Sequence, residues 1–153
     1  MNSALMFSKA SDEWATPQEF YDKLDAEFNF DVDAAATAEN AKCLHWLGPG
    51  SGLSLDALTV PWCHGLWHWL NPPYSRCKEF IAKAAKERVL GVPTVALVPA
   101  RTDTKWFHEY LWDERPNRRE RDGIELRFVR GRLKFGDGKN SAPFPSMVVV
   151  FRP

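Results

Sequence analysis

Asn71, Pro72, Pro73 and Tyr74 are adjacent residues of the types that can hold an aromatic amine. The side-chain carbonyl of Asn71 and the backbone carbonyl of Pro72 are two acceptors, and the proline rings restrict the backbone that carries them. Two such acceptors can localise the lone pair of a ring amine and make its nitrogen a better nucleophile. Tyr74 adds an aromatic face, worth about 1–3 kcal/mol in base stacking. The tetrad therefore predicts a site for a flat, amine-bearing ring, although Asn-Pro also marks ordinary turns.

The neighbouring segments place this tetrad at the end of a strand. Residues 67–70 are apolar and predict a buried strand that stops at Asn71, because consecutive prolines cannot supply the hydrogen bonds of a sheet interior. Residues 28–33 alternate between apolar and polar types and predict an earlier short strand ending at Asp33. Ligands of α/β sheets bind beyond the carboxyl ends of strands, so this convergence favours a site over a turn.

The other segments predict an α/β sandwich. Thr16 is expected to cap a helix that has Pro17 at its first position and Glu19 closing a capping box, with Phe20, Leu24 and Phe28 on one face. The remaining expected elements are a helix over 76–89 capped by Ser75 and bearing Phe80, Ile81, Ala84, Ala85 and Val89 on its apolar side, a parallel strand at 94–98, a helix at about 103–112, an exposed loop at 113–123, and strands at 125–129 and 146–151. This order predicts a Rossmann-like fold, reduced in size, with a mostly parallel sheet and a C-terminal antiparallel strand pair.

Length and composition predict a single domain over residues 11–153, preceded by a flexible lead-in at 1–10. The 44% hydrophobic and 26% charged content is typical of a soluble protein, and the sequence has neither a long apolar run nor a signal-peptide pattern. Three cysteines without CxxC spacing indicate reduced thiols and a cytoplasmic location. The four histidines are scattered, so we expect no metal site.

The formal net charge is zero, which argues against a general polyanion binder, but the charge is unevenly distributed. Residues 1–100 carry 8 Lys and Arg against 12 Asp and Glu, whereas residues 101–153 carry 12 against 8. A phosphate backbone would therefore meet the C-terminal third, unless the asymmetry is only uneven surface charge.

Five segments resemble, in the same order, a known family: DEWATPQEF, FDVDAAATAENAKC, NPPYS, VPARTDTKWF and GRLKFGDGKNSAPFPS. The family is that of the small phage-borne DNA adenine N6-methyltransferases, and the similarity extends over residues 11–152. It implies methyl transfer from S-adenosylmethionine to adenine in DNA, without a covalent enzyme intermediate. It also implies that Asn71, Pro72, Pro73 and Tyr74 hold the target amine. The residues that it places near the cofactor are Thr16, Pro17, Asp33, Ala34, Ala35 and Asp56.

Basic and aromatic residues of the last third are candidates for contact with DNA. A base that is methylated in a duplex must be flipped out while its backbone is held. Arg101 follows a predicted strand at the same sheet edge as Asn71, where it could contact substrate or pair with Asp103. The other candidates are Arg118, Arg119, Arg132, Lys134 and Phe144, of which Phe144 could stack on a base or simply pack.

The chain departs from the usual pattern of such enzymes in two ways. AAAT follows Asp33 where a glycine-rich turn is usual, and only about 37 residues separate Asp33 from Asn71. Carbon-5 methylation of cytosine is rejected because it needs a cysteine nucleophile, and Cys77 lies inside a predicted helix. The alternatives that stay open are methylation of cytosine N4, RNA or a protein amide, and a catalytically silent nucleic-acid binder; the oligomeric state is not predicted.

Overall fold

The computed structural model describes residues 15–52, 56–136 and 141–153. Its main sheet has six strands in the order β2-β1-β3-β4-β8-β7. In chain order these strands are β1 (Val32–Asp33), β2 (His45–Trp46), β3 (His68–Leu70), β4 (Thr94–Pro99), β7 (Ile124–Phe128) and β8 (Ser146–Phe151). The first four pair with one another in parallel, whereas β8 runs antiparallel to both β4 and β7. The predicted mostly parallel sheet with a C-terminal antiparallel pair is confirmed.

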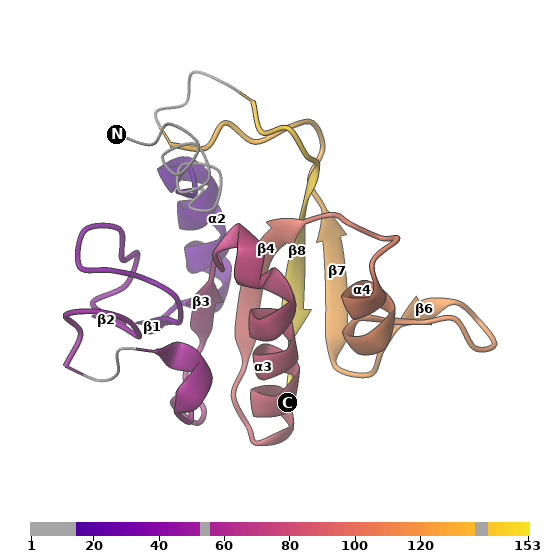
Figure 1. Ribbon diagram of the computed structural model, residues 1–153, viewed down its shortest axis with the longest axis horizontal. Helices are drawn as coiled ribbons and strands as arrows, with labels where there is room; N and C mark the ends of the chain where they lie inside the picture. Colours follow the sequence, from indigo (N-terminus) through magenta and orange to yellow (C-terminus); the bar gives the residue numbers. More distant parts are fainter. Residues whose placement is uncertain (1–14, 53–55, 137–140) are drawn as a thin grey trace.

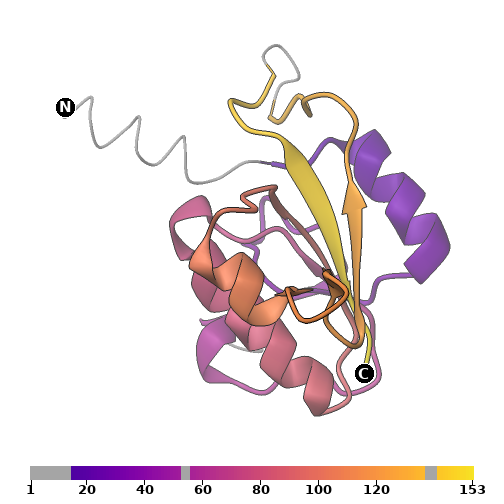
Figure 2. The same cartoon turned by 90° about the vertical axis from the view of Figure 1, so that its right-hand side faces the viewer.

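Helices cover both faces of this sheet and make three layers (Figures 1 and 2). Helix α2 (Gln18–Phe28) packs on one face, and α3 (Cys77–Val89) and α4 (Lys105–Tyr110) lie together on the other. Two short 3-10 turns, η1 (Ala57–Thr59) and η2 (Tyr74–Arg76), lie before β3 and before α3. The expected lead-in at 1–10 lies outside the described residues.

Strands β4 and β8 form the centre of the core, because every residue of both is buried. Trp69 of β3 lies on the α2 side, where its ring packs against Tyr21 at a centroid distance of 5.2 Å and against Phe30 at 5.5 Å. On the same side, Arg127 of β7 donates two hydrogen bonds of 2.6 and 2.7 Å to the Glu27 carboxylate of α2. Aromatic packing and a bidentate ion pair together hold α2 against the sheet.

The start of α2 differs from the predicted capping box. The helix begins at Gln18, with Pro17 rather than Thr16 at the N-cap and no side-chain capping bond. At its other end the helix includes Phe28 and closes at Asn29, which has a left-handed φ of 60°. The predicted strand at 28–33 is therefore wrong over 28–31 and reduced to Val32–Asp33, since helical packing of Phe28 prevails over the local alternation.

Further features also differ from the sequence prediction. The helix expected at about 103–112 is α4, which covers only Lys105–Tyr110. Ser75 does not cap α3, because η2 precedes the helix and Arg76 stands at its N-cap without a side-chain bond. Val89 is 74% exposed rather than core, and Glu87 is buried instead, 2.6 Å from Lys83. The segment 113–123 is not all loop, since β5 (Trp112–Asp113) and β6 (Arg119–Glu120) pair as a separate antiparallel hairpin.

No helix in the described part of the chain is long and apolar enough to cross a membrane. All three cysteines are free: Cys77 is buried, and Cys43 and Cys63 are partly buried.

Candidate active site

The Asn-Pro-Pro-Tyr tetrad lines a pocket at the carboxyl edge of the sheet. Asn71, Pro72 and Tyr74 form one wall directly after β3, and the end of β4 forms another. The residues that complete the lining are Leu97, Val98, Pro99, Phe135 and Phe144. Because β3 and β4 are parallel neighbours, their ends meet at this edge, as expected for a ligand site. Pro73 stands at the N-cap of η2, which turns the chain away into α3.

Aromatic rings give the pocket its flat surfaces. The ring of Tyr74 lies 5.4 Å from that of Phe144, and Phe144 lies 6.0 Å from Phe135, both in tilted arrangements. The Phe135 contact was not predicted from the sequence, although Phe135 lies in the family-like segment GRLKFGDGKNSAPFPS. The long connection between β7 and β8 folds back so that both phenylalanines reach the same pocket.

Arg101 lies beside the pocket, as its position after β4 predicts. Its guanidinium carbon is 5.1 Å from the centre of the Tyr74 ring, within cation–π range. The backbone of Arg101 is held in a tight turn, because its carbonyl accepts hydrogen bonds from the hydroxyl of Thr104 at 2.7 Å and from the Thr104 amide at 3.3 Å. The pairing with Asp103 that the sequence left open is not among the ion pairs of the described residues.

Asp33 shapes the loop that replaces a glycine-rich turn. Its carboxylate is only 3% exposed and accepts backbone N–H bonds from Ala35 at 3.2 Å and from Lys42 at 2.9 Å. The chain after β1 also lies close to the chain after β2, since a side chain at Gly48 would overlap the Ala36 carbonyl. Asp33 therefore fixes the path of residues 34–42, with Ala34 buried and Ala35 partly buried behind it.

The buried Asp33 carboxyl predicts a distinctive pH dependence of stability. Burial raises its pKa to about 7, against the opposing effects of the two backbone hydrogen bonds and the charge of Lys42. Between its ordinary value of 3.8 and about 7, the folded protein keeps a proton that the unfolded chain has lost, so stability falls as pH rises through this window. In Asp33→Asn this contribution is absent. As pH rises through this window, the free energy of unfolding of Asp33→Asn minus that of wild type should therefore increase by up to about 1.4 kcal/mol per pH unit.

Urea denaturation of both proteins from pH 4 to pH 8 measures this difference. A constant offset is expected from the changed hydrogen bonds, but only titration of Asp33 makes the gap vary with pH. Glu27→Gln is a suitable control, since its partly exposed carboxyl has a lowered pKa and should give no gain over this window. A pH-independent gap between Asp33→Asn and wild type would contradict the prediction.

Thr16 and Asp56 are the two residues predicted to lie near the cofactor that are not part of the loop after β1. The hydroxyl of Thr16 is buried and has no hydrogen-bond partner among the described residues. Thr16 lies next to the β7–β8 connection, because the amide of Gly136 donates to the Ala15 carbonyl at 3.1 Å. The Asp56 carboxylate accepts from the Leu58 amide at 3.0 Å and caps η1.

The basic residues predicted to contact DNA fall into two groups. Arg132 and Lys134 lie in the β7–β8 connection beside the pocket, and Arg132 bridges its two arms by donating to the Ala142 carbonyl at 3.2 Å. Arg118 and Arg119 lie on the β5–β6 hairpin and are not among the described residues that line the pocket.

The histidines do not form a metal site within the described ranges. His68 is fully buried and stacks on Trp62, while its Nδ1 lies 2.7 Å from the Leu66 carbonyl and its Nε2 accepts from the Cys63 amide. Burial lowers the pKa of His68, which is consistent with a neutral core histidine. In the part of the chain that the structure describes, no group of three or more His, Cys, Asp or Glu residues could hold a metal.

A Rossmann-like sandwich with an Asn-Pro-Pro-Tyr pocket beyond β3 defines the class of amino-group methyltransferases. The chain belongs to the DNA N-6-adenine-methyltransferase (Dam) family, whose model matches residues 4–153. It is 33% identical over 156 residues to the DNA N-6-adenine-methyltransferase of Escherichia phage T1, and this alignment covers 92% of this chain and 63% of that protein. It is 30% identical over 157 residues to the enzyme of the same name from Haemophilus phage HP1, and this alignment covers 95% of this chain and 83% of that protein.

The fold is also similar to that of a solved structure, the 23S rRNA methyltransferase ErmE. The TM-score is 0.56, and the match covers 92% of this chain and 70% of that chain. Sequence identity is only 11%, so this likeness concerns the fold alone.

Proposed function

We propose that this protein transfers a methyl group from S-adenosylmethionine to the N6 amine of adenine in DNA. The observation that carries the proposal is the pocket itself, which Asn71 and Pro72 line together with Tyr74, Phe135 and Phe144. Family membership and the two phage relatives supply the adenine amine as the target. The same relatives support a place of action in the cytoplasm of a bacterial or phage-infected cell.

The chain's own residues would act by positioning the amine. The carbonyl oxygens of Asn71 and Pro72 accept its two N–H bonds and draw the nitrogen lone pair out of the ring. Tyr74 stacks on the base, and Phe144 supports the Tyr74 ring at 5.4 Å. No charged base is needed, because the amine becomes acidic only after it has gained the methyl group.

Residues at the same sheet edge fit the cofactor. The buried hydroxyl of Thr16, which has no hydrogen-bond partner in the described part of the chain, is suited to a polar ligand group, and Pro17 follows it. The loop that Asp33 organises, with Ala34 and Ala35, offers small side chains next to the strand ends, and Asp56 is the further acid that the family suggests. When bound, S-adenosylmethionine supplies an electrophilic methyl group on a sulfonium centre.

The target base would have to leave the duplex to reach this pocket. Extrusion costs a few kcal/mol, which contacts with the flanking backbone must offset. Arg101 next to Tyr74, together with Arg132 and Lys134 on the β7–β8 connection, provides positive charge at the pocket rim. These contacts are the proposed role of the basic C-terminal third.

The test is incubation of purified protein with methyl-labelled S-adenosylmethionine and unmethylated DNA, followed by digestion to nucleosides. Label is expected in N6-methyldeoxyadenosine, and parallel reactions with RNA and with DNA lacking adenine serve as controls. Label in N4-methyldeoxycytidine or in RNA would replace the proposed substrate. Binding of DNA without transfer to any nucleoside would instead indicate a catalytically silent binder.

A further inference from the structure

The β5–β6 hairpin stands apart from the main sheet. Its two strands pair only with each other, with Trp112 opposite Glu120 and Asp113 opposite Arg119. The amide of Arg121 donates to the Leu111 carbonyl at 2.8 Å and closes the base of the hairpin. A two-stranded ribbon of this size is not stable alone, so its position depends on what holds it to the body of the protein.

Two acids of the hairpin, Asp113 and Glu114, already have partners, whereas two of its exposed arginines do not. Asp113 accepts from the Arg115 amide at 2.9 Å and lies 3.5 Å from the Arg115 guanidinium. The Glu114 carboxylate lies 2.9 Å from Nδ1 of His108. Arg118 and Arg119 are exposed and have no acidic partner within the described ranges, and a φ of 46° at Arg118 turns the chain sharply between them.

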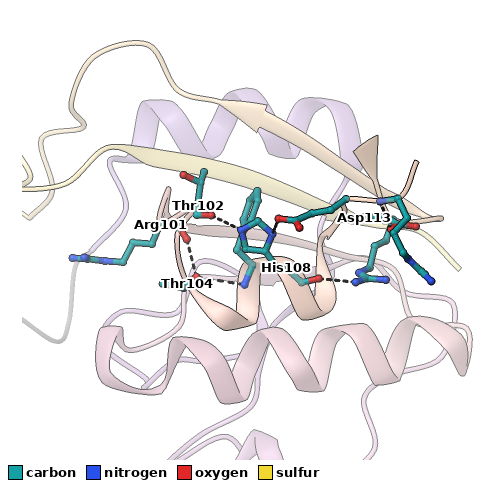
Figure 3. Close-up of polar contacts among 9 residues, drawn as sticks. Arg101, Thr102, Thr104, His108 and Asp113 are labelled. Carbon is teal, nitrogen blue, oxygen red and sulfur yellow. Dashed lines mark hydrogen bonds and ion pairs between the residues drawn. The ribbon is translucent and has the colours of Figure 1, made fainter. Parts of the chain in front are cut away.

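His108 of α4 joins the hairpin to the body of the protein (Figure 3). Its Nε2 lies 2.7 Å from the Thr102 carbonyl, while Nδ1 faces Glu114. The His108 carbonyl accepts from the Arg121 guanidinium at 2.6 Å. Nε2 and the backbone carbonyl of His108 are therefore hydrogen-bonded, to the turn after β4 and to Arg121 of the hairpin. Nδ1 lies beside Glu114 as a contact that is an ion pair when the ring is protonated.

The turn that His108 contacts is the turn that carries Arg101. Figure 3 shows the Arg101 side chain extending away from the His108 cluster, and its guanidinium lies over the pocket residue Tyr74. The carbonyls of Arg101 and Thr102 are both bonded, to Thr104 and to His108. A short series of polar contacts thus connects the base pocket to the arginine-bearing hairpin.

We propose that the β5–β6 hairpin is a second DNA-binding surface, which contacts backbone phosphates of the duplex beside the target base, and that His108 is the positioning residue that sets its distance from the pocket. This inference rests on the proposed function and adds a surface and a residue to it. Phosphate is the ligand that suits Arg118 and Arg119, because guanidinium groups bind it through paired, charge-assisted bonds.

Salt dependence of DNA binding tests the surface. Binding of a fluorescent duplex with several base pairs on each side of the target is followed by anisotropy at increasing salt. The slope of log K against log salt is negative and becomes steeper with each phosphate that the protein neutralises. If Arg118 and Arg119 each neutralise a phosphate, the slope of the double variant Arg118→Gln/Arg119→Gln should be less steep by about 1.8. Between about 50 and 200 mM salt the wild type then loses about tenfold more affinity than the double variant. An unchanged slope would overturn the proposed surface.

Two single variants test the positioning role. His108→Ala removes no arginine, yet it should make the slope less steep, as the double variant does. Adding His108→Ala to the double variant should change the slope little further. Glu114→Ala separates position from charge, since loss of an acid beside the arginines alone would strengthen phosphate binding, whereas loss of the His108 contact weakens it. Glu114 is 66% exposed, so this variant should fold even if His108→Ala does not. Full wild-type slopes in both variants would contradict the role of His108.

Lys23→Gln is the matched control. Lys23 lies on α2, across the sheet from the hairpin, and pairs weakly with Glu19. Its variant should keep the wild-type slope and activity, so a loss there would assign the effect to overall charge. Nucleoside analysis distinguishes the two failures. If wild type methylates DNA and the hairpin variants keep the wild-type salt slope, only this inference is refuted. If wild type neither binds nor methylates DNA, the proposed function is refuted as well.

Discussion

Asn71→Ala is expected to reduce methyl transfer by about 10²–10³-fold while leaving the fold intact. The substitution removes a preorganised acceptor that acts on the reacting nitrogen, and loss of one such group typically costs about 3–4 kcal/mol of transition-state stabilisation. Asn71 is only partly buried at the pocket rim, so its truncation leaves no large core cavity. The single-turnover rate of label transfer to unmethylated DNA measures the effect.

Asn71→Asp is the informative companion variant. A carboxylate keeps an acceptor oxygen at the same place, so it should retain more activity than alanine despite its charge. Thermal unfolding of both variants serves as the control for folding. If alanine were as active as wild type, Asn71 would have no part in holding the amine, and the pocket would need another acceptor.

Trp69→Ala is expected to destabilise the protein by about 3–5 kcal/mol, the largest effect on stability that we predict. Trp69 is 1% exposed and packs between β3 and α2, edge-on to Tyr21 and tilted against Phe30. Its removal leaves a cavity in a layer that cannot collapse, because the β-sheet fixes one side and the Arg127–Glu27 pair helps to hold the other. Urea denaturation at fixed pH measures the loss.

Trp67→Ala is the matched control for Trp69→Ala. Trp67 lies two positions earlier and contacts Phe28 at a centroid distance of 4.7 Å, but it is only partly buried. Its loss should therefore cost clearly less than that of Trp69. Equal losses for the two tryptophans would mean that burial at Trp69 does not determine the stability of this layer.

Elements with strong local signals could be predicted from the sequence. Strand β8 coincides with the predicted residues 146–151, and β4 extends the predicted strand at 94–98 only to Pro99. Both are continuous apolar runs preceded by proline, which leaves little choice of structure or boundary. The pocket position of Asn71 followed for the same reason, because the prolines end β3 and strand ends are where ligands bind.

Features that depend on distant contacts could not be predicted from local sequence. Phe28 fits an alternating strand pattern as well as a helical one, and only its packing against Trp67 and the sheet selects the helix. Phe135 reaches the pocket because a long connection folds back over the sheet edge. The hairpin that contains Arg119 contacts α4 through Glu114 and His108, a long-range contact for which the sequence carries no local signal.

The place of β8 in the sheet has a consequence for the order of folding. β8 pairs residue 99 with residue 146 and residue 94 with residue 151, so a late part of the chain inserts between β4 and β7. Contacts of such long sequence separation form slowly and late. Because Phe144 precedes β8 directly, the aromatic wall of the pocket is complete only after this insertion. A chain in which β8 has not yet inserted between β4 and β7 should therefore lack the aromatic wall and be catalytically silent.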